Sequence, residues 1–251
     1  MSELNPAQQT VICIRWGTAY GADYVNRLHR AVTRNVVRPT RFVAFTDPVE
    51  GLDVGIDARP IPPIRLPDGL KPGPWRKLAL WAADLGGLDG EVLFLDLDVL
   101  VTGPLDPLFE HEPGKLVLVR NPTQGRREGI GNTSVMRFRA GSAPHLLRDF
   151  EADAVAMSHR FDNEQIYVTR ESRLPTAFWP KEWCPSFKHH LLKPWPLYLF
   201  SPPDLPPAAR IVVFTGHPRP DEALRGVWPT RWYKRFYRAT PPVAWVGEHW
   251  R

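Results

Sequence analysis

The chain of 251 residues has few cysteines and no long apolar run. Its two cysteines, Cys13 and Cys184, are too few for a disulfide framework or a structural zinc site, and they fit a reducing compartment. No apolar run approaches the ~20 residues that a transmembrane helix needs, and the opening MSELNPAQQT lacks the apolar core of a signal peptide. These absences predict a soluble, cytoplasmic protein.

A dinucleotide-binding glycine motif is also absent, because the loop after the first expected strand, Gly17 to Gly21, is not G-x-G-x-x-G. The composition, 43% hydrophobic and 24% charged, is that of a globular protein. Lysine and arginine (32) exceed aspartate and glutamate (27), which gives a formal charge of +5. This excess suits an anionic ligand or surface. We expect no nucleic-acid partner.

The most informative stretch runs from Glu91 to Phe109, EVLFLDLDVLVTGPLDPLF. Its apolar run, Val92 to Leu95, has the length of a strand buried on both faces, which is typical of a parallel sheet. The run stops at Asp96 and Asp98, whose side chains can converge because residues two apart in extended backbone point to the same side. Open α/β sheets bind ligands beyond the carboxyl ends of their strands. Because paired carboxylates repel unless a cation or a shared proton relieves them, we interpret the pair as half of a divalent-cation site that also holds a phosphorylated ligand.

Two other interpretations of this pair stay open. The carboxylates could be solvated residues at a strand end. An apolar strand that runs into Asp-x-Asp is also how haloacid-dehalogenase-type phosphatases begin, with the first aspartate, here Asp96, as nucleophile. Those enzymes continue with Gly-Thr close to the amino terminus, whereas this chain continues with Val99 and Leu100 after a whole half-domain.

The residues before this stretch predict the opening of a Rossmann-like sheet. Val11 to Trp16 and Arg41 to Phe45 are expected strands, and apolar residues between them recur at helical spacing. Strand, helix, strand is how such sheets begin. Trp16 or Tyr20 could stack on a nucleobase, and Asp47 could bind a base or a ribose, although each residue type is more often structural.

A helix opened by Pro74 and continuing to Leu85 is expected before the central stretch, and Lys77 in its first turn could reach a phosphate or the first carboxylate. After the central stretch, strands are expected at Lys115 to Arg120 and Asn132 to Phe138, separated by a loop that carries Arg126 and Arg127. The remaining expected elements are an amphipathic helix over 144–157, a polar cluster FDNEQ (161–165) that starts another helix, and a last strand IVVF (211–214).

The order of these pieces resembles a GT-A-fold glycosyltransferase of the retaining kind that includes glycogenin and bacterial lipooligosaccharide galactosyltransferases. The resemblance runs from about Val11 to Pro220 and rests on LFLDLDVLVTGPLDPLF, GNTSVMRF, FDNEQ and VVFTGHPRP. It implies one Rossmann-like α/β domain over residues 1–227, with a mostly parallel central sheet flanked by helices, followed by a basic and aromatic tail over 228–251.

The resemblance also implies roles for matching positions. Asp96 and Asp98 would hold Mn²⁺ or Mg²⁺ against the phosphates of a sugar nucleotide. The family's metal-binding histidine lies just before the final glycine, whereas here the histidine follows Gly216, and His217 is carried over as the third ligand. The other matches are Gly17, Thr18 and Tyr20 for the nucleoside, Lys77 for the diphosphate and donor sugar, Asn132 for the sugar, Asp162, Asn163 and Glu164 beside the reacting carbon, and Arg219 for a phosphate-binding lysine.

Together these expectations describe a metal-dependent glycosyltransferase that moves a sugar from a UDP-linked donor to a glycan or lipid-linked acceptor, with retention at the anomeric carbon. A hard cation that bridges the phosphates would neutralise the charge on the departing nucleoside diphosphate. Two alternatives remain, a phosphatase that uses Asp96 as nucleophile and a sugar-nucleotide-binding protein without activity.

The tail, WPTRWYKRFYRATPPVAWVGEHWR, interleaves basic and aromatic residues. This pattern suits the interface of an anionic membrane, where amphipathic rings settle at headgroup depth. The alternative is that the aromatic rings pack back onto the domain. The first interpretation predicts peripheral attachment at the cytoplasmic face, with a lipid-linked glycan of lipopolysaccharide biosynthesis as acceptor.

Overall fold

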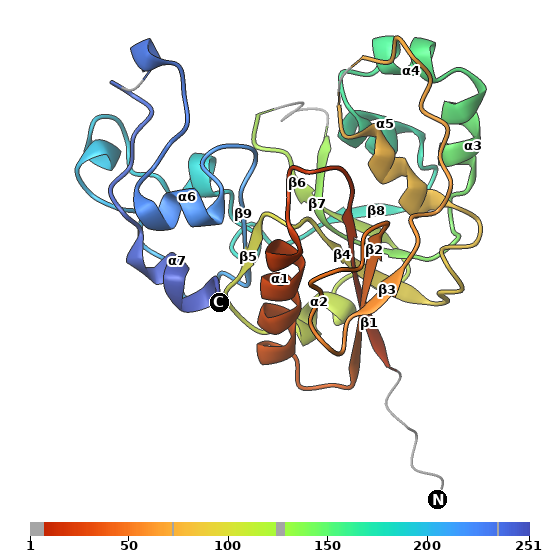
Figure 1. Cartoon of the computed structure of the whole chain (residues 1–251), viewed down its shortest axis with the longest axis horizontal. Coiled ribbons are helices and arrows are strands. Elements are labelled where there is room, and N and C mark those ends of the chain that lie inside the picture. The colour runs from red at the N-terminus through yellow and green to blue at the C-terminus, as the bar shows by residue number, and fades with distance from the viewer. Residues whose placement is uncertain (1–7, 72, 124–128, 235) are drawn as a thin grey trace, which may run out of the picture.

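The computed structural model describes residues 8–71, 73–123, 129–234 and 236–251. Figure 1 shows helices on both sides of a twisted central sheet. The strands are β1 (Gln9–Arg15), β2 (Thr40–Thr46), β3 (Asp57–Arg59), β4 (Glu91–Leu95), β5 (Val99–Val101), β6 (Leu116–Arg120), β7 (Gly131–Arg139), β8 (Thr176–Phe178) and β9 (Ile211–Val213). The helices are α1 (Ala22–Arg34), α2 (Asp106–Glu110), α3 (His145–Ala152), α4 (Ala154–Arg160), α5 (Glu164–Glu171), α6 (Pro220–Arg225) and α7 (Ala244–His249). Short 3₁₀ segments lie at Trp75–Trp81, Leu197–Leu199 and Trp232–Lys234, and a π-helical turn lies at Phe187–Leu191.

Within the described residues, seven strands form the central sheet in the order β3-β2-β1-β4-β7-β6-β8. Neighbouring strands run parallel except at β7, which is antiparallel to both β4 and β6. The predicted mostly parallel α/β sheet is therefore confirmed. One edge of the sheet collects the carboxyl ends of the parallel strands together with the amino end of β7, and this is the edge where α/β folds bind ligands.

Both faces of the sheet are covered by apolar layers. In β1, Val11 and Cys13 face the layer that contains α1, whereas Ile12 and Ile14 face the layer that contains the Trp75–Trp81 segment and α3 to α5. This alternation gives β1 and β4 their nearly continuous apolar sequences, because every side chain of a doubly covered strand is buried.

Three expected elements differ in the structure. The helix expected from Pro74 to Leu85 is a 3₁₀ segment that ends at Trp81, and its buried Trp75, Leu78 and Trp81 follow the three-residue repeat of that helix type. The helix over 144–157 is two helices separated at Asp153, whose side chain accepts the Ala156 backbone N–H. The last strand, β9, pairs antiparallel with β5 outside the central sheet. The expected loop arginines Arg126 and Arg127 lie outside the described residues.

The tail over 228–251 divides in two. Val243, Val246 and Trp250 are buried in one apolar cluster with Leu100 of β5 and Ala223 of α6, so α7 packs onto the domain. The side chains of Trp232, Tyr233, Phe236 and Tyr237 are instead exposed. No helix of the described residues has the length and apolarity needed to cross a membrane.

Candidate active site at the end of the first and fourth strands

A cavity of about 200 Å³ lies beyond the carboxyl ends of β1 and β4. Three chain segments build it: the end of β1 with its following loop, the 3₁₀ segment, and the turn between β4 and β5. The residues that line it are Ile14, Trp16, Ala19, Tyr20, Pro74, Lys77, Asp96, Leu97 and Asp98. The sheet thus brings together five predicted site residues (Trp16, Tyr20, Lys77, Asp96 and Asp98) at its ligand edge.

Asp96 and Asp98 lie in a turn rather than in extended backbone. The Asp96 backbone N–H donates to the Ser134 carbonyl of β7, and the Val99 N–H donates to the Asp96 carbonyl. The turn therefore begins where β4 ends, and β5 resumes directly after Asp98. The prediction that both carboxylates serve one cavity agrees with this placement, but the two side chains are brought together by a turn and not by the strand pleat.

Lys77 is the buried cation of this site. Its ammonium nitrogen lies 2.7 Å from Asp96 Oδ1 and 2.9 Å from Asp96 Oδ2, and 3.7 Å from Glu164 Oε1. Burial lowers the pKa of Lys77, but the charges of Asp96 and Glu164 outweigh that effect and the net shift is upward. Lys77 therefore stays protonated and joins the first aspartate of the turn to α5.

Glu164 is only 1% exposed and begins α5. Its Oε1 accepts a hydrogen bond from the Thr133 hydroxyl of β7, and its Oε2 has no hydrogen-bond partner among the described residues. Burial raises the pKa of Glu164, and the charge of Lys77 and the Thr133 hydrogen bond partly oppose the rise. Glu164 thus lies behind Lys77 rather than at the surface of the cavity.

The other two residues of the predicted catalytic cluster lie differently from Glu164. Asn163 is the N-cap of α5, and its Oδ1 accepts the Ile166 N–H at 3.1 Å. Asp162 is 74% exposed and lies 3.5 Å from Lys71 in an ion pair. Asn163 is therefore the residue of the FDNEQ cluster that caps the helix.

Asp98 has a different environment from Asp96. Its Oδ2 accepts the Tyr20 hydroxyl at 3.0 Å, and the Arg219 guanidinium lies 4.5 Å over the Tyr20 ring. Burial and the charge of Asp96 raise the pKa of Asp98 to about 7, while the Tyr20 hydrogen bond and Lys77 oppose the rise. Arg219 also donates to the Ala19 carbonyl at 3.0 Å, which ties the loop after β1 to the start of α6.

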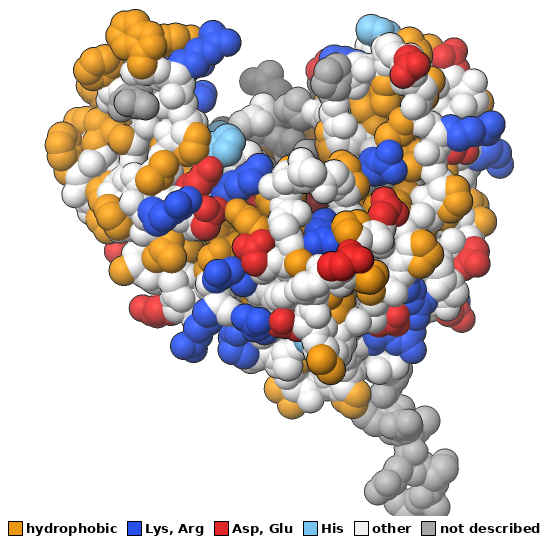
Figure 2. All heavy atoms as spheres, in the orientation of Figure 1, with side chains coloured by type: hydrophobic (Ala, Val, Ile, Leu, Met, Phe, Trp, Pro, Cys, Tyr) orange, Lys and Arg blue, Asp and Glu red, His pale blue; other side chains and the backbone are white. Residues whose placement is uncertain are grey.

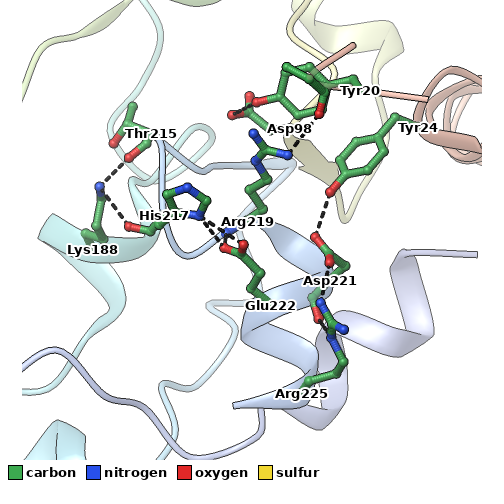
Figure 3. A network of polar contacts seen from close by, with 11 residues as sticks. Tyr20, Tyr24, Asp98, Lys188, Thr215, His217, Arg219, Asp221, Glu222 and Arg225 are labelled. Carbon is green, nitrogen blue, oxygen red and sulfur yellow. Dashed lines mark hydrogen bonds and ion pairs between the residues drawn. The ribbon is translucent and has the colours of Figure 1, made fainter. Parts of the chain in front are cut away.

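His217 points to Glu222 rather than to the two aspartates (Figure 3). Its Nδ1 lies 2.7 and 2.9 Å from the Glu222 carboxylate oxygens, and Glu222 also accepts the Arg219 backbone N–H. In the same view Lys188 donates to the backbone carbonyls of Thr215 and His217. Lys188, from the Phe187–Leu191 turn, was not predicted from the sequence.

The residues present fit a divalent cation through two carboxylates. Asp96 and Asp98 are hard oxygen donors, and the pKa of Asp98 is raised first by burial and second by the nearby charge of Asp96. No group of three His, Cys, Asp or Glu side chains with metal-binding geometry occurs within the described ranges, so His217 does not join the pair. Mg²⁺ and Mn²⁺ favour oxygen ligands, and Mg²⁺ is commonly bound by one or two carboxylates plus substrate phosphates.

Four other predicted binding residues, Asn132, Gly17, Thr18 and Asp47, do not line the cavity. Asn132 is buried at the amino end of β7, where its Oδ1 accepts the Ser134 N–H at 2.9 Å. Gly17, with φ of +61°, and Thr18 are exposed in the loop after β1 and do not line the cavity. Asp47 is exposed after β2 and likewise lies outside its lining.

Sequence reasoning missed Thr133 and Lys188, which reach their partners only through tertiary contacts. Thr133 lies inside the GNTSVMRF segment, so its place in β7 was predictable, but its pairing with Glu164 was not. Lys188 lies in a segment without regular sequence pattern. No local signal connects it to residues 215–217.

No protein-family model and no curated protein sequence matches this chain. Solved structures do match it. The galactosyltransferase LgtC, in complex with donor and acceptor sugar analogs, aligns over 84% of this chain and 89% of its own, with 13% identity and a TM-score of 0.56. An active-site mutant of LgtC aligns over 96% of this chain and 100% of its own, with 15% identity and a TM-score of 0.58.

The glycosyltransferase GlyE of Streptococcus pneumoniae aligns over 84% of this chain but only 56% of its own, with 15% identity and a TM-score of 0.56. The structural neighbours are thus glycosyltransferases. The chain has the GT-A-like fold related to LgtC, as the sequence resemblance implied.

Proposed function

We propose that this protein is a metal-dependent glycosyltransferase that uses a UDP-linked sugar and retains the configuration of the anomeric carbon. The observation that carries the proposal is the cavity at the ligand edge of this fold, which combines Asp96, Asp98 and the buried cation Lys77 with two aromatic residues, Trp16 and Tyr20. Carboxylates suit a cation, the cation suits a diphosphate, and aromatic rings suit a nucleobase.

In the proposed reaction an acceptor hydroxyl oxygen bonds to the anomeric carbon, the bond from that carbon to the diphosphate oxygen breaks, and the hydroxyl proton passes to the departing diphosphate. A bound Mn²⁺ or Mg²⁺, held by Asp96 and Asp98, would stabilise the negative charge of the diphosphate. Lys77 offers a positive charge to the same group from inside the cavity, and Arg219 offers one from the rim. Glu164 acts through Lys77, since its carboxylate lies 3.7 Å from that ammonium.

Calorimetry with UDP and UDP-sugars in the presence of Mn²⁺ tests the donor site. Asp96→Asn and Asp98→Asn should abolish Mn²⁺-dependent binding, whereas the matched control Asp89→Asn, at an exposed turn before β4, should bind like the unaltered protein. Unchanged affinity in both site variants would show that the donor binds elsewhere.

Product analysis separates this proposal from its two alternatives. A transferase forms a glycoside and free UDP. A phosphatase with Asp96 as nucleophile releases phosphate from a monoester, and a binding protein gives neither product. The phosphatase is disfavoured by the sequence after the aspartate pair, which continues with Val99 and Leu100 in place of Gly-Thr.

The proposed acceptor is a glycan or a lipid-linked glycan such as those of lipopolysaccharide biosynthesis. The enzyme would bind it at the cytoplasmic face of a membrane. An exposed aromatic surface supports it (Figure 2, upper left). Two segments form this surface, joined by a hydrogen bond from the Tyr198 hydroxyl to the Tyr237 carbonyl. Its exposed large side chains are Trp195, Leu197, Phe200, Trp232, Tyr233, Phe236 and Tyr237.

Basic residues accompany these rings, namely Lys193, Arg231, Lys234 and Arg238. Each basic residue near an anionic bilayer contributes about 1 kcal/mol of attraction, so attachment should be peripheral and sensitive to salt. The tail cannot be tested by truncation after Val227, because that would also remove the buried Val246 and Trp250.

Point substitutions avoid that problem. The double variant Trp232→Ala/Phe236→Ala should lose co-sedimentation with vesicles of phosphatidylcholine and phosphatidylglycerol at low salt. The control Val37→Ala/Val54→Ala, at exposed apolar residues outside this surface, should keep it. If the unaltered protein stays in the supernatant, the membrane proposal is wrong while the donor-site proposal stands.

A further inference from the structure

A second cavity, of about 410 Å³, lies at the same edge of the sheet as the donor cavity. It is formed where β6 and β8 end, and its lining includes Arg120 and Asn121 after β6, and Phe178 and Trp179 at the end of β8. The two cavities share no lining residue. Its volume lies within the range of ~300–1,000 Å³ that is usual for small-molecule sites.

The sheet order fixes the spacing of the two cavities. β4, which ends at Leu95 just before Asp96, is separated from β6 by one strand, β7. Neighbouring strands lie ~4.8 Å apart, so the ends of β4 and β6 lie ~10 Å apart. β7 begins at this edge with Gly131 and Asn132, the latter predicted to contact the donor sugar. A molecule in the second cavity would therefore lie beside the sugar end of a donor in the first.

The charged side chains that line the second cavity are basic. Arg120, Lys181 and His190 line it, and none of its described lining residues is acidic. Arg120 lies with its guanidinium 4.1 Å over the Phe178 ring, and no carboxylate in the described part of the chain forms an ion pair with Arg120 or Lys181. A cavity of this composition attracts anions.

The remaining walls are fixed in orientation. The Trp179 indole N–H donates to the Val135 carbonyl at 3.0 Å, which holds the ring in place. His190 Nδ1 accepts the Ser186 backbone N–H, so a neutral imidazole carries its proton on Nε2. Cys184 is 2% exposed, and burial raises the pKa of its thiol. Its thiol is therefore suited to shaping the wall rather than to nucleophilic chemistry.

We propose that this second cavity binds the acceptor, and that the acceptor sugar carries a negative charge as a phosphate or a carboxylate. The inference rests on the proposed transferase function and adds the chemical class of the second substrate. Arg120 and Lys181 would bind the anionic group by charge-assisted hydrogen bonds, and the aromatic wall would contact the sugar ring. The acceptor hydroxyl would then lie toward β7 and the donor.

Ligand-detected NMR titration of the full-length protein with UDP and Mg²⁺ tests the proposal. The probes are glucose, glucuronate and glucose 6-phosphate, which share a ring and differ in charge. At least one anionic probe should bind about tenfold or more tightly than glucose, and the comparison between them separates carboxylate from phosphate recognition. The double variant Arg120→Ala/Lys181→Ala should lose about tenfold or more of that affinity, the scale of charge-assisted hydrogen bonds.

Arg139→Ala is the matched control, because it removes an exposed arginine at the opposite end of β7. Both variants should bind UDP like the unaltered protein. Equal binding of glucose and both anionic sugars, or an unaffected double variant, would overturn the acceptor proposal while normal UDP binding keeps the donor site. Conversely, anion-selective binding without UDP binding would leave the cavity as an anionic-sugar site and remove the transferase function.

Discussion

Lys77 and Asp96 form an ion pair in which the ammonium nitrogen lies 2.7 Å from one carboxylate oxygen and 2.9 Å from the other. Asp98, two residues along, has a tyrosine hydroxyl as its partner instead of a cation. Before any ligand binds, the charge of Asp96 is therefore neutralised by a cation, whereas that of Asp98 is not. That asymmetry leads to distinct expectations for their substitution.

Asp96→Asn should destabilise the metal-free protein, because it leaves Lys77 with Glu164 as its closest remaining carboxylate. The expected loss is about 1–3 kcal/mol, since Asp96 is partly exposed and the pair is partly screened. Asp98→Asn should leave stability equal or higher, because it removes a buried carboxylate that is repelled by Asp96. Urea unfolding of both variants without metal checks this order, and equal losses would contradict it.

The pH dependence of stability should reflect Asp98. Its pKa in the folded protein is raised from 3.8 to about 7, so the folded state binds this proton more tightly than the unfolded state does. Proton binding to Asp98 therefore stabilises the folded state at low pH. This contribution to the free energy of unfolding is lost as pH rises from about 4 through 7. Comparison of metal-free unfolding at pH 5 and pH 8 should show a smaller change in Asp98→Asn than in the unaltered protein. Parallel pH curves for the two proteins would refute the assignment.

Thr133→Val should destabilise the fold by about 1–3 kcal/mol, because the buried Glu164 carboxylate loses its hydrogen-bond donor while side-chain volume is kept. The same loss should raise the pKa of Glu164 further. Thr133→Ser, which restores the hydroxyl, should recover most of the stability. Thermal unfolding of the pair measures the effect, and a serine variant as unstable as the valine variant would point to packing instead.

Turnover should separate Glu164 from Asp162. Glu164→Gln should lower the rate by at least ~100-fold, because the charge that positions Lys77 is lost, while UDP affinity changes little. Asp162→Asn changes an exposed side chain paired with Lys71, and we expect less than about a tenfold loss. Steady-state rates for both variants decide between a shared catalytic cluster and a single positioning carboxylate; equal large losses would favour the shared cluster.

The parts of the fold that could be predicted are those whose cause is local in sequence. The apolar runs of β1 and β4 identify doubly covered strands without knowledge of their neighbours. The two aspartates were predictable because a polar pair after such a strand falls at the ligand edge. The 3₁₀ geometry of Trp75–Trp81 was harder to predict from the sequence, since apolar residues three apart fit an α-helix almost as well.

The parts that could not be predicted depend on distant chain segments meeting. Thr133 and Glu164 are 31 residues apart, and they meet because α5 packs beside β7. The second cavity depends on β6 pairing with β8, which brings Arg120 near Phe178 across 58 residues. His217 was carried over as a metal ligand although it follows Gly216 where the family's histidine precedes the glycine, and in the structure its side chain contacts Glu222.

The contact between α1 and Trp250, which follows α7, determines when the loop after β1 can gain its full support during synthesis. Arg27 donates to the Trp250 carbonyl across 223 residues, and Tyr24 packs edge-on against the Trp250 ring. Tyr24 in turn neighbours Tyr20, the residue that binds Asp98. On the ribosome, α1 emerges about 220 residues before Trp250, so this support for the Tyr20 loop cannot form until residue 250 has left the exit tunnel. Domains can begin to fold while translation continues, but the loop beside Asp98 should be fully supported only after residue 250 has emerged.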